Sequence, residues 1–276
     1  MKTRIIYSDN GTLTDLTSQL NDYNANTKAF TFVASEDSIL LGSIYPFTSK
    51  YFKNTSPNST PSVLTVSYWD GTQWRAASNY TDETGLSGTP FSSSSNLSFS
   101  TDKRYPWVAD DTTSNGVEHI TGFGTGTTIY DLYWIKLTYA TNIAMTLSWV
   151  GDVYCSDSDL QSVAPSVMNA TFMDDWESGK TDWEDQRVAA TRLLIEEMKG
   201  INLQSENLLL DKDELSMAAA FRTLAVIYGE MGDVEKFNMY MARVEVLVRQ
   251  SFSKDKNLDG RTNPNEVGIR TSVFKR

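Results

Sequence analysis

The chain has 276 residues, of which 40% are hydrophobic and 21% are charged, a composition typical of a folded protein rather than a disordered one. Its 24 Lys and Arg against 35 Asp and Glu give a net charge of −11, which argues against the positive surface of a nucleic-acid-binding protein. The single cysteine excludes an internal disulfide framework, and no run of about 18 apolar residues predicts a membrane span.

The start of the sequence lacks the features of a secretory signal. Residues 1–11 contain charges but no apolar segment after them, so no signal peptide is expected. A large β-rich region without disulfides suits a reducing compartment. We therefore expect synthesis and folding in the cytosol, with Cys155 as an inert thiol.

The first half of the chain has the pattern of short strands. Apolar and polar residues alternate, Trp, Tyr and Thr are frequent, and polar turns such as Asp70-Gly71 separate the segments. Gly/Ser-rich residues 85–96 are expected to form a flexible loop, and residues 109–128 a second loop. An antiparallel β-sandwich or jelly roll is predicted, with strands at 28–33, 38–42, 44–47, 50–52, 63–69, 72–74, 97–100, 129–139 and 145–150.

The character of the sequence changes after about Val150, where the helical period replaces alternation. Thr181 with Glu184 reads as a capping box, and Gly200 as the end of that helix. Gly232 separates two further helices, which predicts an antiparallel hairpin. The expected helices are 183–199, 215–231 and 234–252. The predicted class is therefore α+β with two domains: a β-sandwich at 1–155, a linker with short helices at 156–180, a helical domain at 181–254, and a loop with an extended C-terminal tail at 255–276.

One segment fits the pattern of a calcium-binding loop. Residues 255–266 match D-x-[DN]-x-[DN]-G-x5-E, which places oxygen ligands at alternate positions around a glycine turn. The expected ligands are Asp255, Asn257, Asp259, Glu266 and the carbonyl of Arg261. Thr262 and Pro264 depart from the pattern, and the other interpretation is an Asp/Asn/Gly turn that caps its own backbone. Both interpretations remain open.

No catalytic centre is evident, and the chain is predicted not to be an enzyme. His119 is the only histidine, and no nucleophile elbow accompanies it. The acidic pairs 110–111 and 174–175 could serve a glycan hydrolase, but they resemble solvated turns. Aromatic residues could instead form a sugar-binding platform, with the strand residues Trp69 and Trp134 assigned to the core; the full set is Trp69, Trp74, Tyr80, Trp107 and Trp134.

The helical half resembles head–tail connector (adaptor or neck) proteins of tailed bacteriophages. The similar features are the Ala-rich segment 217–228 (MAAAFRTLAVIY), the segment 235–243 (EKFNMYMAR), the Asp/Asn/Gly loop and the terminal segment 269–276 (IRTSVFKR). The β half is similar to sandwich modules of phage virion proteins in residues 68–74 and 133–137. The typical short adaptor has no such module. The β half of this chain is therefore expected to decorate the neck or to anchor fibres.

The resemblance implies a structural protein of the virion neck, made in the host cytoplasm. It would form a homo-oligomeric ring, twelvefold by family resemblance, bridging the portal protein and the next neck or tail ring. The acidic surface would let DNA pass the lumen without specific binding, and no membrane partner is expected. The tail has strand character and a basic end, and its docking residues would be Ile269, Arg270, Val273, Phe274, Lys275 and Arg276. The alternative is a carbohydrate-binding or adhesion module of a tail or baseplate protein.

Overall fold

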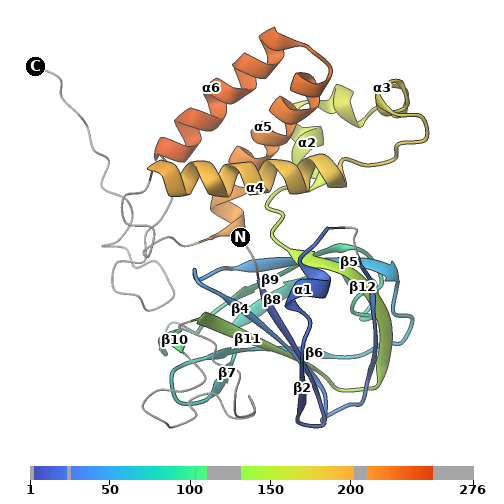
Figure 1. The fold of residues 1–276 in the computed structure, drawn as a ribbon, viewed down its shortest axis with the longest axis vertical. Helices are drawn as coiled ribbons and strands as arrows, with labels where there is room; N and C mark the ends of the chain where they lie inside the picture. Colours follow the sequence, from blue (N-terminus) through green and yellow to red (C-terminus); the bar gives the residue numbers. More distant parts are fainter. Residues whose placement is uncertain (1–2, 24–25, 103, 111–131, 202–209, 251–276) are drawn as a thin grey trace, which may run out of the picture. The chain divides into compact units, whose positions relative to one another are not determined.

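The structure is a computed structural model of the chain, and it describes residues 3–23, 26–102, 104–110, 132–201 and 210–250. These residues form two antiparallel sheets and six α-helices, which confirms the predicted α+β class (Figure 1). They separate into two compact units, residues 3–151 and 152–250. The first unit holds the strands and the short helix α1, and the second holds the remaining helices.

The larger sheet of the first unit has the strand order β2-β1-β4-β11-β6-β7, with β10 paired to β11. Its strands are β1 (Arg4–Asp9), β2 (Thr12–Asp15), β4 (Ser38–Ser43), β6 (Leu64–Trp69), β7 (Trp74–Ala76), β10 (Ala109–Asp110) and β11 (Leu132–Tyr139). The smaller sheet has the order β3-β12-β5-β9-β8. Its strands are β3 (Lys28–Phe32), β5 (Ser49–Ser56), β8 (Asn79–Asp82), β9 (Ser95–Ser100) and β12 (Ile143–Gly151).

Aromatic rings fill the space between the two sheets. Tyr7 of β1 meets Phe30 and Phe32 of β3 edge to face, with ring centroids 5.3 and 5.4 Å apart. Trp107 lies between Phe99 of β9 and Tyr133 of β11, at 5.7 and 5.4 Å. The sheets therefore face each other as a sandwich, and such edge-on pairs stabilise it by about 0.5–1.5 kcal/mol each beyond their buried area. The jelly-roll arrangement stays a prediction.

The larger sheet is apolar on its outer face as well. Side chains along a strand alternate between the two faces of a sheet. Trp69 and Trp134 therefore lie on the face opposite Tyr68 and Ile135. A buried cluster follows this outer face, consisting of Ile6, Leu40, Trp69, Leu132 and Trp134. Gly42 of β4 makes room for the Trp134 ring, since a Cβ there would lie 2.8 Å from it. The outer face is therefore buried over this cluster, whereas Thr65 on the same face is exposed and Lys136 is half-buried.

Several features of the β unit depart from the sequence prediction. Residues 4–15 form the β1–β2 hairpin, which was not predicted; Asn10 and Gly11 supply the two positive φ angles, +45° and +82°, of its tight turn. Residues 85–96 are fixed to the sandwich rather than free. Phe91 is fully buried, its N–H donates to Thr84 Oγ1 at 2.9 Å, and its carbonyl accepts from the N–H of Asn58 at 3.0 Å.

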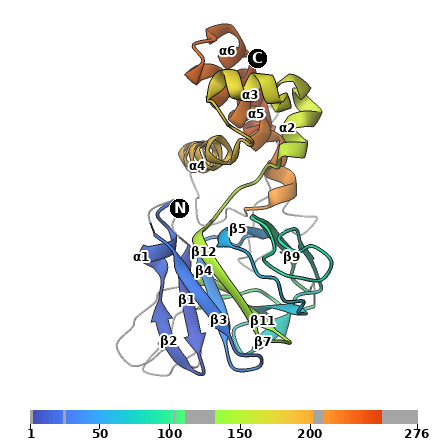
Figure 2. The same cartoon turned by 90° about the vertical axis from the view of Figure 1, so that its right-hand side faces the viewer.

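The other predicted strands are present with shifted ends, although the predicted 72–74 shares only Trp74 with β7 and no strand was predicted at β8. The predicted strand at 44–47 is wrong, because those residues form bends and an isolated bridge before β5 begins at Ser49. A four-residue helix, α1 (Thr17–Leu20), precedes β3. It lies beside β1 (Figure 2). The hydroxyl of Thr17 accepts from the N–H of Ile5 at 3.0 Å and ties the two together.

The second unit begins with short helices, as predicted for residues 156–180. These are α2 (Asp157–Val163), the 3-10 helix η1 (Pro165–Met168) and α3 (Ala170–Trp176). Ser156 forms a capping box with Asp159 at the start of α2. Trp183 is fully buried beside them, and its indole N–H donates to the Val167 carbonyl at 2.9 Å.

Three longer helices complete the unit: α4 (Glu184–Ile201), α5 (Lys212–Glu230) and α6 (Val234–Gln250). The predicted cap at Thr181 is wrong, because Asp182 Oδ1 accepts from the N–H of Glu184 at 2.9 Å. Gly200 lies inside α4 and does not end it. No helix among the described residues is long and apolar enough to cross a membrane.

Candidate functional site

The α5–α6 hairpin is built around a three-residue turn. Gly232 has a φ of +76°, and its N–H donates to the Gly229 carbonyl while that of Asp233 donates to the Tyr228 carbonyl, at 3.1 and 2.9 Å. This pair of bonds is a Schellman ending, which needs a residue that accepts positive φ. Asp233 Oδ1 then accepts from the N–H of Lys236 at 3.1 Å and caps α6. The predicted antiparallel hairpin is confirmed.

Stacked aromatic rings hold the two helices of the hairpin together. Tyr228 and Tyr240 stack with centroids 5.7 Å apart and an interplanar angle of 13°. The Arg243 guanidinium lies 5.2 Å from the centroid of the Phe221 ring. Tyr228, near the end of α5, pairs with Tyr240, and Phe221, earlier in α5, pairs with Arg243, which comes later in α6. This order of contacts is that of antiparallel helices.

The α5 helix lies at the centre of the unit and is buried through most of its length. Its small residues Ala218, Ala219 and Ala220 let neighbouring helices approach closely. Leu194 and Met198 of α4 are fully buried. Both α4 and α6 pack on α5 (Figure 1).

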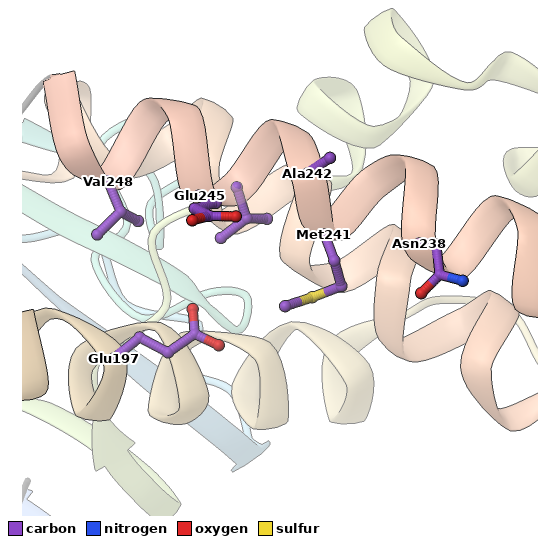
Figure 3. A pocket seen from close by; sticks show the side chains of 7 residues that line it. Glu197, Asn238, Met241, Ala242, Glu245 and Val248 are labelled. Atoms are coloured by element: carbon purple, nitrogen blue, oxygen red, sulfur yellow. The ribbon is translucent and has the colours of Figure 1, made fainter. Parts of the chain in front are cut away.

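The space between α4 and α6 is a surface groove of about 400 Å³. We call it the α4–α6 groove; its lining residues are Glu197, Asn238, Met241, Ala242, Val244, Glu245 and Val248. Figure 3 shows the Glu197 carboxylate reaching from α4 toward α6, and the Met241 side chain reaching from α6 toward α4. Val244 and Val248 are buried at its base, whereas Ala242 and Glu245 are exposed at its rim.

An ion pair lies at the side of the groove. Arg222 Nη2 of α5 lies 2.9 Å from Glu197 Oε1, and the Arg222 side chain is only 12% exposed. The same guanidinium contacts the sulfur of Met241. The groove therefore combines an apolar base with the carboxylate of Glu245 and that of Glu197, which pairs with Arg222.

The most reactive side chain of the unit is shielded. Cys155 is fully buried, and burial raises the pKa of its thiol to about 11, against the weaker opposite effects of Thr223 and Arg187. The Cys155 sulfur lies 3.4 Å from the Thr223 hydroxyl. Because the thiolate is the reactive form, the predicted inert thiol agrees with this environment.

The aromatic residues considered for sugar binding do not form an exposed platform. Trp69 and Trp134 are buried, as predicted for strand residues. Trp107 is also buried: it is 1% exposed, and its indole N–H donates to the Trp134 carbonyl at 3.1 Å. Trp74 is half-buried on the outer face, and the Tyr80 hydroxyl donates to the Leu64 carbonyl at 2.7 Å.

One member of each acidic pair considered for hydrolysis has a structural partner, and Asp111 lies outside the described residues. Asp110 is buried, and its Oδ2 accepts from the Trp69 indole N–H at 2.7 Å. Asp174 Oδ1 accepts from the N–H of Gly179 at 2.8 Å. Among the described residues no group of three or more His, Cys, Asp or Glu side chains could hold a metal ion.

Several predicted site residues lie outside the described residues, and their predictions stay predictions. They are His119, the loop residues Asp255, Asn257, Asp259, Arg261 and Glu266, and the tail residues Ile269, Arg270, Val273, Phe274, Lys275 and Arg276. Sequence reasoning missed the α4–α6 groove. Glu197 and Glu245 are 48 positions apart, and only the packing of both helices on α5 brings them to one surface. Comparison with known protein families finds no matching family, and comparison with curated proteins finds no match.

Proposed function

We propose that this protein is a structural component of a tailed-bacteriophage virion that forms an oligomeric ring at the head–tail junction. The observation that carries the proposal is the α4–α6 groove, an open surface in the helical unit with an apolar base and a charged rim. A protein that assembles side by side needs such a surface on each copy, since a closed ring is made of identical contacts between different faces of its subunits.

The order of helices supports the same proposal. The segments that resemble connector proteins, 217–228 and 235–243, lie in α5 and α6 and form the hairpin of the helical unit. In that family a small helical bundle packs side by side beneath the portal. The proposed partners are therefore other copies of the chain, the portal protein, and the next ring of the neck or tail.

The proposal assigns separate roles to the parts of the chain. Residues 181–254 would be the ring-forming domain, and residues 1–155 a separate domain of sandwich or jelly-roll type that faces outward. The buried aromatic residues of the β unit suit a rigid module better than a sugar-binding surface. The role is structural and not enzymatic, and the place of action is the virion neck.

The mass of the assembled protein tests the proposal. Twelve chains of 30.9 kDa would give a particle of about 371 kDa. Mass photometry of the purified chain, and of necks isolated from virions, is expected to find one ring-sized species, with rotational symmetry in electron micrographs. A chain that stays a 30.9 kDa monomer at every concentration and is absent from particles would contradict the proposal.

A further inference from the structure

We propose that two copies of the chain pair through one end of the β unit. The surface consists of four loop segments, which we call the loop row; from one side to the other they are 33–36, 140–142, 57–63 and 85–90. All four lie at the end where β3 and β11 stop and where β6 and β12 begin. The inference goes beyond the proposed function and does not rest on it, because the proposed ring forms through the helical unit.

Hydrogen bonds join the four segments side by side. The Ala34 N–H donates to Asn142 Oδ1 at 2.8 Å. Ser62 links its own segment to two others, because its Oγ accepts from the Thr141 N–H at 3.1 Å and its N–H donates to the Gly88 carbonyl at 3.0 Å. These bonds place the segments in their order and tie the loops into one surface.

The backbone of the loops at this end is strained. In the described part of the chain, four residues other than glycine have a positive φ, and all of them lie in these loops: Asn10, Ser35, Ser87 and Phe91. A side chain makes a positive φ costly unless neighbouring contacts hold it, and such strain is concentrated at functional surfaces. The turn that contains Asn10 is held in this way, since its N–H donates to Asp37 Oδ1 at 3.0 Å. Loops fixed before binding lose less entropy when a partner docks.

The loop row exposes aliphatic side chains and carries little charge. Val33, Val63 and Leu86 are 41%, 65% and 68% exposed. Glu36 is the only charged residue of the four segments, in a chain of which 21% is charged. Apolar side chains and depleted charge characterise the centre of protein–protein interfaces. The phosphate groups of nucleic acids and of anionic lipids require basic residues instead, and the four segments contain none.

Charge and geometry point to a second copy as the partner. Each copy has a net charge of −11, so contact between most of their faces opposes like charges, whereas the loop row opposes few. Val63 lies in an inner segment of the row, with Val33 and Leu86 in the two outer segments. A two-fold axis near Val63 would place this residue against its counterpart, and Val33 against Leu86 of the other copy. Glu36 would then face the uncharged segment 85–90 rather than another carboxylate.

Thiol cross-linking of the full chain tests the pairing. Val63→Cys places a thiol at the centre of the row, and Ile44→Cys is the control, because Ile44 is 54% exposed at the opposite end of the same unit. The natural chain is the blank, since Cys155 is buried. With a short bismaleimide, Val63→Cys should form a dimer of two 30.9 kDa chains about tenfold faster than Ile44→Cys, because pairing raises the local concentration of the second thiol. Equal rates would overturn the proposal.

A mixture of two variants tests the two-fold arrangement. Val33→Cys and Leu86→Cys place thiols in the outer segments, which the proposed axis brings together across the contact. An equal mixture of the two should therefore yield more covalent dimer than either variant alone at the same total concentration. A mixture that yields no more dimer than the separate variants would refute the two-fold pairing.

A charge at the centre of the row tests the contact without a cross-linker. Val63→Asp would bring two carboxylates together at the axis, so the association constant measured by sedimentation should fall about tenfold or more. Ile44→Asp should leave that constant unchanged, and circular dichroism of both variants confirms that they remain folded. An unchanged constant in Val63→Asp would contradict the proposal.

The native mass of the same samples separates this inference from the proposed function. Ring-sized particles in which Val63→Cys cross-links no faster than Ile44→Cys would overturn the pairing and leave the proposed function in place. Dimers that depend on Val63, in samples without rings at any concentration, would support the pairing and contradict the proposed function.

Discussion

Asp70 closes the β6–β7 hairpin, and its carboxylate provides a prediction that can be worked out from the structure. One oxygen, Oδ1, accepts from the N–H and hydroxyl of Thr72 and the N–H of Gln73, at 2.8, 2.7 and 2.7 Å. The other, Oδ2, accepts from Arg75 Nε at 2.6 Å. Burial would raise the pKa of Asp70, but the hydrogen bonds from Arg75, Thr72 and Gln73 outweigh it and hold the pKa well below its ordinary value.

Asp70→Asn keeps Oδ1 but turns an amide N–H toward the N–H of Arg75. A charge-assisted bond contributes about 1.5–3 kcal/mol, and the 29% exposure of the Arg75 side chain favours a loss of about 2 kcal/mol at pH 7. The free energy of unfolding decreases by about 2 kcal/mol per molar urea, so the urea concentration at the midpoint of unfolding should fall by about 1 M. Tryptophan fluorescence suits this assay, since five of the seven tryptophans lie in residues 3–151.

The pH dependence gives the prediction a second test. Because the folded pKa of Asp70 is lowered, its contribution is complete above the unfolded pKa of about 3.9 and is lost as the pH falls below it. The difference between Asp70→Asn and the natural chain should therefore shrink below about pH 4. Asp102→Asn is the control, because its partner Arg104 is 79% exposed and such pairs contribute about 1 kcal/mol or less. Two outcomes would refute this reasoning: equal stability losses in Asp70→Asn and Asp102→Asn, or a stability loss in Asp70→Asn that does not change with pH.

Three further predictions concern packing, reactivity and capping. Gly42→Ala should lower the free energy of unfolding by about 1–3 kcal/mol in urea titration, because the new methyl lies 2.8 Å from the Trp134 ring; an unchanged midpoint would contradict this contact. Cys155 should resist labelling by a thiol reagent at pH 8 in the native chain and react fully in denaturant, so rapid native labelling would be inconsistent with its burial. Asp211→Ala should cost about 1 kcal/mol, because Asp211 Oδ1 accepts from the N–H of Asp213 at 2.9 Å at the start of α5, whereas Asp211→Asn keeps the cap; similar thermal stability of both variants would argue against this role.

The elements that could be predicted are those with strong local signals. The alternation at 64–69 and 132–139 predicted β6 and β11, and Gly232 predicted the turn between α5 and α6. The β1–β2 hairpin was missed although Asn10-Gly11 is a strong two-residue turn signal, because Ile5, Ile6 and Tyr7 are consecutive and do not alternate with polar residues. The predicted end of α4 at residue 199 lies two residues before Ile201, a difference within the usual spread of helix boundaries.

The sequence by itself determined the net charge, the absence of internal disulfides and the change from strands to helices after about Val150. Each of these depends only on composition or on neighbouring residues. Tertiary structure alone decided that Trp107 is buried. Trp107 follows no regular strand, yet it fills the space between two sheets. The α4–α6 groove has the same origin, because Glu197 and Met241 meet only when both helices pack on α5. Contacts between residues far apart in the sequence depend on how helices and strands pack together. The local sequence pattern does not specify that packing.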